Sequence, residues 1–283
     1  MLLGARSPFP LVRAAVCAAR VRPAFHGCGG TRVSVPGRNE SLPSSPRLTL
    51  MKSTYGAHTV HAASGGQTAG DLAIVRALTT AGVKITLGSK SFTRKSILTE
   101  MGLPYEIEVA GIDEKAIRFE DPNQLVTALA LAKADAIRKI IKNDNESQKY
   151  NTFLITCDQV VVYDGTIREK PHDETQARAF IKSYGKKPVS TVGSIAVTDL
   201  ATGAVFSAND TSTICFSNIP DSVIDDLITE GTCLQCAGGL MVEHPLLVPL
   251  TLSIDGTMDG LMGLNKKVLG KLLEDALDAR SSS

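Results

Sequence analysis

One acidic residue, Asp158, interrupts a stretch that otherwise predicts a buried β-strand. The apolar run 153–157 (FLITC) precedes it, and the run 160–163 (VVVY) follows one residue later. A carboxylate in an apolar core loses solvation free energy that a cation, a metal ion or a proton must restore. We therefore expect Asp158 to have a functional partner.

A polar and basic loop, 88–95 (GSKSFTRK), follows a predicted strand and opens a predicted helix. The first turn of a helix binds anions through its free N–H groups and its dipole. Arg94 can hold two phosphate oxygens at once, and Lys95 adds a point charge. The loop lacks the Gly-Lys-Thr ending of a Walker loop. We interpret it either as a phosphate site or as an ordinary capped helix with solvated basic residues.

Length and composition allow a substantial core. The chain has 283 residues, a formal net charge of +1 and 43% apolar residues. A charge near zero gives no electrostatic signal for nucleic-acid binding. No apolar run approaches the roughly 18–20 residues of a membrane-spanning helix. We therefore expect neither nucleic acid nor a membrane as a partner, and we leave a homodimer open.

The six cysteines are scattered, and two of them, Cys233 and Cys236, form a C-x-x-C pair. A zinc site needs two more ligands, usually a second close pair, and the sequence has no such pair. Reduced thiols in a reducing compartment are the favoured interpretation. A zinc site and a redox pair remain as alternatives.

The N-terminal region differs in composition from the rest of the chain. The first 50 residues hold seven arginines, no lysine, no aspartate and one glutamate, Glu40. This composition is typical of an organellar presequence, and residues 11–21 could form a short basic amphipathic helix. The alternative is a leader without a role, ahead of a start at Met51. We expect 1–80 to be a disordered or targeting extension, so that mitochondrial targeting stands beside a cytoplasmic location.

Helices and strands alternate along residues 84–280. The expected strands are 84–87, 105–109, 153–163 with a return strand to 169, 189–199, 204–217 and 247–254. The expected helices are 71–81, 94–101, 121–142, 173–184, 220–229 and 264–277. Both hairpins and crossovers are needed to connect them. We expect one α/β domain over 84–280, with a mixed β-sheet flanked by helices.

Other charged residues could join Asp158 in one site. Mg²⁺ binds through one or two carboxylates plus substrate phosphates, and it polarises a phosphoryl oxygen; Glu114 and Glu243 are candidate carboxylates. Lys133 lies on an apolar helix face, and Lys170 precedes a proline. Singly, each has an ordinary explanation, such as a surface glutamate or a lysine that extends to solvent. Together with Asp158, the two lysines would neutralise a polyphosphate.

Six short motifs, in order along the expected domain, resemble those of the Maf (septum-formation-like) nucleoside triphosphate pyrophosphatases. The family patterns are S-x-S-P-R-R-K, D-E, A-x-x-K-A, G-[AS]-D-[TQ]-V, G-K-P and G-L-P. Here they read SKSFTRK at 89–95, DE at 113–114, LAKA at 131–134, CDQV at 157–160, EKP at 169–171 and GLN at 263–265. Phe92 and Thr93 replace the proline and the first arginine, and Asn265 replaces the last proline. The resemblance covers nearly all of the domain and none of 1–80.

The resemblance implies hydrolysis of a nucleoside triphosphate to the monophosphate and pyrophosphate, with a divalent cation such as Mg²⁺ or Mn²⁺. It also implies an elongated sheet with an active cleft between two lobes, as in Maf and ITPase-like folds. Asp158 would accept the proton of the attacking water and bind the metal together with Glu114. The residues implied to bind the phosphates are Lys133, Lys170, Ser89, Arg94 and Lys95.

Three positions separate two branches of the family. The branch that acts on dTTP and UTP has Arg, Thr and Gln there, whereas this chain has Thr93, Gln159 and Glu243. All three resemble the 7-methyl-GTP pyrophosphatase branch, which has its glutamate in C-A-G-x-x-x-x-E. An ionised carboxylate only accepts hydrogen bonds, which suits a guanine edge or a cationic methylated base. A dTTP, UTP or CTP pyrophosphatase is the alternative within the family.

A second class of function is a nucleotide-binding regulator that has lost turnover. The departures from the family pattern at Phe92, Thr93 and Asn265 would suit such a protein. The presence of Asp158 and of both lysines favours an enzyme.

Overall fold

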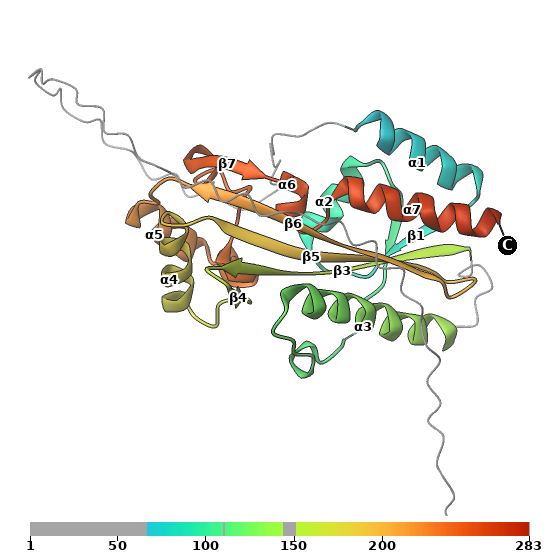
Figure 1. Ribbon diagram of the computed structural model, residues 1–283, viewed down its shortest axis with the longest axis horizontal. Coiled ribbons are helices and arrows are strands. Elements are labelled where there is room, and N and C mark those ends of the chain that lie inside the picture. Colours follow the sequence, from blue (N-terminus) through green and yellow to red (C-terminus); the bar gives the residue numbers. More distant parts are fainter. Residues whose placement is uncertain (1–66, 110, 144–150, 283) are drawn as a thin grey trace, which may run out of the picture. The chain divides into compact units, whose positions relative to one another are not determined.

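The computed structural model describes residues 67–109, 111–143 and 151–282. In this part of the chain a seven-stranded mixed sheet has the order β2-β1-β3-β5-β6-β7, and β4 pairs with β3 outside that order. Helices cover both faces of the sheet (Figure 1). This architecture confirms the expected α/β fold class. None of the described helices is both long enough and apolar enough to cross a membrane.

The strands are β1 (Lys84–Leu87), β2 (Tyr105–Ile107), β3 (Thr152–Tyr163), β4 (Thr166–Arg168), β5 (Val189–Asp199), β6 (Val205–Phe216) and β7 (Thr251–Asp255). The helices are α1 (Ala69–Thr80), α2 (Phe92–Glu100), α3 (Pro122–Asn143), α4 (Glu174–Tyr184), α5 (Asp221–Glu230), α6 (Met258–Leu261) and α7 (Lys266–Ser281).

Two elements begin at other residues than the sequence predicts, each for a local chemical reason. Helix α2 begins at Phe92 because the Ser91 hydroxyl accepts the Arg94 amide as a helix cap. The last strand begins at Thr251, after a 3₁₀ turn at Val248–Leu250. Pro249 lies in that turn, where it does not need to donate to a strand ladder.

Helix α1 lies ahead of residue 84, where we expected the domain to begin. Thr68 and Asp71 form a reciprocal capping box at its start. Its buried residues Ile74 and Leu78 belong to the same apolar cluster as residues of α7. The folded unit therefore extends ahead of residue 84. The interpretations that concern 11–21 and Met51 lie outside the described residues.

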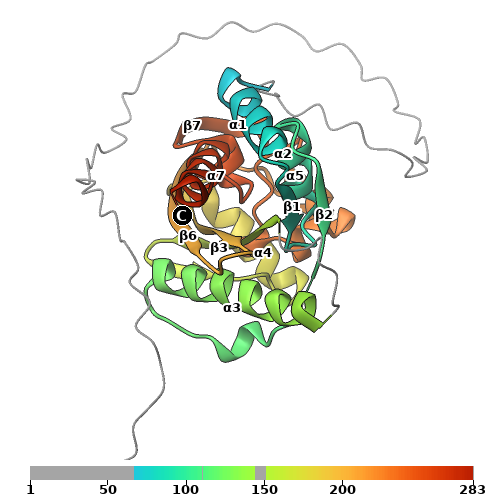
Figure 2. The same cartoon turned by 90° about the vertical axis from the view of Figure 1, so that its right-hand side faces the viewer.

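The side chains of β3 alternate between two environments, as in any strand. Leu154 and Val160 pack in clusters with α3. Cys157 packs with α1, α2 and α7 in one large cluster, and Val161 packs with α4 and α5 in another. Figure 2 shows α3 on one face of the sheet and α7 on the other. Met262, after α6, packs against both large clusters, so the middle of β3 lies where they meet.

One edge of β3 is only partly paired. β1 pairs with it over 152–155, and β4 pairs with it over 161–163. β5 occupies the opposite edge over 153–163. Among the described strands, none pairs with the first edge over 156–160, and we call this stretch the β3 gap. β1 and β4 both end at the β3 gap, and Asp158 lies at its centre.

The end of α7 is attached to the sheet by a buried ion pair. Arg280 donates to Asp199 Oδ2 at 2.8 Å, and its guanidinium lies 4.5 Å from the centre of the Phe153 ring. Burial raises the pKa of Asp199, but hydrogen bonds from Arg280, the Ala201 amide and Thr202 outweigh it and hold the pKa below its ordinary value. The pair therefore stabilises the fold above the pKa of Asp199 in the unfolded chain. This stability is lost as the pH falls through the lower folded pKa.

We expect Arg280→Met to lower the free energy of unfolding at neutral pH by about 3 kcal/mol, because it leaves a buried carboxylate unpaired. Urea denaturation followed by circular dichroism measures the change. The control is Arg178→Met, whose partner Asp225 is 59% exposed, and it should cost less than about 1 kcal/mol. Equal losses in the two variants would contradict a special role for the buried pair.

Candidate active site

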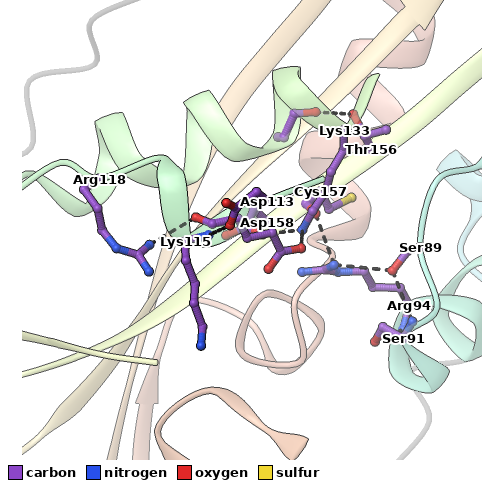
Figure 3. A network of polar contacts seen from close by, with 12 residues as sticks. Ser89, Ser91, Arg94, Asp113, Lys115, Arg118, Lys133, Thr156, Cys157 and Asp158 are labelled. Atoms are coloured by element: carbon purple, nitrogen blue, oxygen red, sulfur yellow. Dashed lines mark hydrogen bonds and ion pairs between the residues drawn. The ribbon is translucent and has the colours of Figure 1, made fainter. Parts of the chain in front are cut away.

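Three charged side chains meet at the β3 gap (Figure 3). Lys133 Nζ, from α3, lies 2.6 Å from Asp158 Oδ1 and 3.0 Å from Glu114 Oε1. Asp158 is nearly buried and the Lys133 side chain is 16% exposed, whereas the Glu114 side chain is 56% exposed. Two carboxylates thus converge on one ammonium group, one from the sheet and one from the turn at Glu114–Ala116.

The environment of Asp158 shifts its acidity. Burial raises the pKa of this carboxyl, the Lys133 and Arg94 charges lower it, and the Glu114 carboxylate raises it; the net pKa lies above its ordinary value. Oδ2 of Asp158 accepts no hydrogen bond from the residues that the structure describes. A carboxylate with a raised pKa and an unused oxygen is suited to accept a proton.

Arg94 fills part of the β3 gap. Its Nη1 donates to the Cys157 carbonyl at 3.2 Å and to Ser89 Oγ at 3.4 Å, and its Nε donates to the Gly263 carbonyl at 3.0 Å. Ser89 is buried, and its hydroxyl also accepts the Ser91 amide. The start of α2 is therefore held against the unpaired edge of β3. This arrangement directs a helix N-terminus and a fixed guanidinium to one place.

Lys170 approaches the β3 gap from the other side. It is exposed, it lies two residues beyond the end of β4, and it makes no ion pair with any described residue. Because Arg168 pairs with Val161 in antiparallel register, the chain after Arg168 runs toward residue 159. Lys95 differs from the other expected phosphate ligands. It is half-buried on α2, and no contact connects its side chain to the Asp158 network.

Two of the three positions that distinguish the branches, Thr93 and Gln159, meet at one corner of the fold. Thr93 Oγ1 donates to the Met262 carbonyl at 3.1 Å, and Gln159 Nε2 donates to the Gly260 carbonyl at 2.8 Å. Both side chains thus hold the corner between α6 and α7. Glu243 is half-buried, and burial raises the pKa of its carboxyl.

Sequence reasoning missed the backbone groups that hold these side chains. The carbonyls of Gly260, Met262 and Gly263 accept the bonds from Gln159, Thr93 and Arg94. A backbone acceptor leaves no trace in residue type. Only the motif at 263–265 pointed to this segment, and its Asn265 caps α7 by accepting two backbone amides.

A cavity of about 600 Å³ lies near the network but is not lined by it. Its walls come from α1, α2, α6 and α7, and neither Asp158 nor Lys133 contributes to them. The cavity and the network share the α6 corner, since Met262 lines the cavity and also accepts the Thr93 hydroxyl.

The C-x-x-C pair does not have the properties of a reactive thiol pair. Burial raises the pKa of the Cys233 thiol, and it raises that of Cys236 to about 11. Thiols with raised pKa values are poor nucleophiles and poor metal ligands at neutral pH. Among the described residues, no group of three or more His, Cys, Asp or Glu side chains could hold a metal ion.

Comparison with known proteins supports the motif analysis. A 7-methyl-GTP pyrophosphatase from Dictyostelium discoideum is 38% identical over 189 residues, which are 67% of this chain and 95% of the relative. A nucleoside triphosphate pyrophosphatase from Chlamydia pneumoniae is 31% identical over 193 residues, 68% of this chain and 93% of the relative. One from Synechococcus sp. (strain CC9311) is 30% identical over 167 residues, 56% of this chain and 84% of the relative.

The family described as Maf-like protein matches residues 84–276, a range that contains the β3 gap and every residue of the network around it. On this match and these relatives, the chain belongs to the Maf-like protein family.

Proposed function

We propose that this protein is a metal-dependent pyrophosphatase that hydrolyses 7-methyl-GTP, or another modified nucleoside triphosphate, to the monophosphate and pyrophosphate. The observation that carries the proposal is the Asp158–Lys133 pair at the β3 gap, which two basic segments border. The relatives named above support the reaction class.

The triphosphate binds between the two segments that border the β3 gap. Arg94, Ser89 and the first amides of α2 hold phosphate oxygens from one side, and Lys170 holds them from the other. Lys133, on α3, contributes a further positive charge. Its Nζ lies 2.6 Å from Asp158 Oδ1 in the structure. These cations offset the negative charge that accumulates on the phosphoryl groups during attack.

Asp158 acts as the general base. Its raised pKa increases its basicity, and Lys133 orients the carboxylate through Oδ1. Oδ2 accepts a proton from the water that attacks the α-phosphorus, and pyrophosphate leaves with the electrons of the broken bond. No covalent intermediate is needed.

The residues present fit a divalent cation. The Asp158 and Glu114 carboxylates already converge on one positive charge, and oxygen ligands of this kind suit Mg²⁺ or Mn²⁺. With only two carboxylates, the site would use substrate phosphates as further ligands. When bound, the cation would polarise the phosphoryl oxygens and lower the pKa of a nearby water.

Glu243 is the residue that we propose recognises the nucleotide base (the base reader). Its half-buried carboxylate accepts hydrogen bonds only, and guanine presents N–H donors on its Watson–Crick edge. The positive charge of a 7-methylated guanine would further favour the ionised carboxylate over an amide. The name of the Dictyostelium relative supports this preference.

A substrate panel tests the function. Purified protein would be incubated with Mg²⁺ or Mn²⁺ and with 7-methyl-GTP, GTP, UTP, CTP and dTTP, and monophosphate and pyrophosphate would be quantified. We expect turnover that is highest for 7-methyl-GTP and that EDTA abolishes. Preference for UTP, CTP or dTTP would support the other branch. Binding without turnover of any nucleotide would support the regulator.

We expect Asp158→Asn to lower kcat by about 10²- to 10⁴-fold, because the amide cannot accept the proton. Nucleotide binding, measured by isothermal titration calorimetry, should change little. The control is Asp135→Asn on the same stretch of α3 as Lys133, since Asp135 is exposed and, among the described residues, pairs with Arg138. A variant that retains more than about a tenth of the rate would rule out the base role.

Two variants should move the pKa of Asp158 in opposite directions in metal-free protein. Lys133→Met should raise it, because the ammonium that favours the carboxylate is lost, and Glu114→Gln should lower it, because a like charge is removed. Carbon-detected NMR titration of the aspartate carboxyls measures both shifts. A base works when ionised, so the acid limb of the pH–rate profile should move to higher pH in Lys133→Met. Shifts in the same direction would contradict the proposed charge balance.

Glu243→Gln should change base preference more than rate. We expect the kcat/KM ratio of 7-methyl-GTP over UTP to fall at least about tenfold, the size of one charge-assisted hydrogen bond. The control is Glu230→Gln, which makes the same change in a carboxylate bonded to the adjacent His244 at 2.9 Å. An unchanged kcat/KM ratio of 7-methyl-GTP over UTP in Glu243→Gln would exclude Glu243 as the residue that recognises the base.

A further inference from the structure

Gly238 is bonded through both of its backbone polar groups to other segments. Its amide donates to the Glu169 carbonyl at 2.8 Å, and its carbonyl accepts the Tyr184 hydroxyl at 2.6 Å. Its φ of 60° is left-handed, and a Cβ there would lie 2.6 Å from Tyr184 Oη and 2.9 Å from Val161. Glycine is therefore required for this close approach.

Tyr184 is a rigid donor for this contact. It is 1% exposed at the end of α4, and its ring meets that of Tyr163 edge to face at 5.6 Å between centres. The Arg168 guanidinium lies 4.1 Å from the Tyr163 ring centre and 5.1 Å from that of Tyr184. Burial raises the pKa of Tyr184 to about 12, so that its hydroxyl keeps its proton near neutral pH.

The contact connects the two ends of the proposed substrate site. Glu169, which accepts the Gly238 amide, directly precedes Lys170. Gly238 lies in the segment that leads from Cys236 to Glu243. The Cys236 thiol is influenced by the charges of both Glu243 and Lys170, which lie close enough to act on it. The distance between the phosphate-binding lysine and the base-reading carboxylate therefore depends on how this segment is held.

We propose that Tyr184 is a positioning residue for base selection: its hydrogen bond to Gly238 fixes the 236–243 segment against Glu169 and so sets where Glu243 meets the base. Tyr184 itself touches neither the substrate nor the reacting atoms. The inference rests on the proposed function, because it concerns how that same site chooses its base.

Tyr184→Phe tests the inference, and Tyr163→Phe is its matched control. Each variant removes one hydroxyl that donates to a backbone carbonyl from the same aromatic cluster, at 2.6 Å to Gly238 and at 2.8 Å to Ser183. Only the Tyr184 bond reaches the 236–243 segment. We expect Tyr184→Phe to lower the kcat/KM ratio of the preferred over the poorest nucleotide by about 3- to 10-fold, the range of one hydrogen bond. The kcat for the preferred nucleotide should change less than about twofold, and Tyr163→Phe should leave the ratio unchanged.

Hydrogen exchange gives a second readout that needs no substrate. The amides of 238–243 should exchange faster in Tyr184→Phe but not in Tyr163→Phe. Gly238→Ala tests the same contact from the glycine, because its Cβ would lie 2.6 Å from Tyr184 Oη, and the same loss of discrimination is expected.

The outcomes separate the inference from the function on which it rests. Wild-type protein without turnover of any nucleotide overturns the proposed function and the inference with it. Wild-type turnover with an unchanged ratio in Tyr184→Phe, or an equal loss in Tyr163→Phe, overturns the inference alone.

Discussion

The site depends on a break in strand pairing. β3 is paired with β5 over 153–163, but its other edge meets β1 and β4 only at its two ends. Backbone groups in the middle of that edge need other partners, because unpaired buried groups are unfavourable. Arg94 supplies one by donating to the Cys157 carbonyl. The same break admits two loops from opposite directions, so one strand brings an acid, a guanidinium and a lysine-bearing segment together.

The ammonium group of Lys133 lowers the free-energy cost of ionising Asp158 in that buried position. A buried carboxylate without a cation would bind a proton, and the net rise in the pKa of Asp158 shows that burial still outweighs its cations. The ammonium is shared with the exposed Glu114, so its attachment to Asp158 is not exclusive. Asp158 is thus held through Oδ1, while its second carboxylate oxygen accepts no hydrogen bond from the described residues.

Residue type and spacing predicted the parts of this site but not their arrangement. The sequence predicted three parts of the site, because each depends only on neighbouring residues. These parts are the acid within an apolar run, the loop at a strand end and the helix that carries Lys133. The sequence did not predict the β3 gap, because the gap is set by where β1 and β4 stop pairing with β3. Helix α1 was expected as a short helix, yet its packing on α7 depends on residues about 200 positions apart in the chain. The Tyr184–Gly238 bond spans 54 residues and ends on a carbonyl, which no residue pattern can encode.

Successive side chains of β3 point to opposite faces of the sheet, so Asp158 and Gln159 have different partners. Asp158 points toward α3 and Lys133, whereas its neighbour Gln159 points to the opposite face and holds the α6 corner through Gly260. A change at 159 therefore acts on the α6 corner, which Thr93 and Arg94 also hold, and not on the bond between Asp158 and Lys133. The segment that leads to Glu243 has a separate anchor, because the Gly238 carbonyl accepts the hydroxyl of Tyr184 at the end of α4. The positions that we propose to select the base are therefore held by contacts other than those of the Asp158–Lys133 pair.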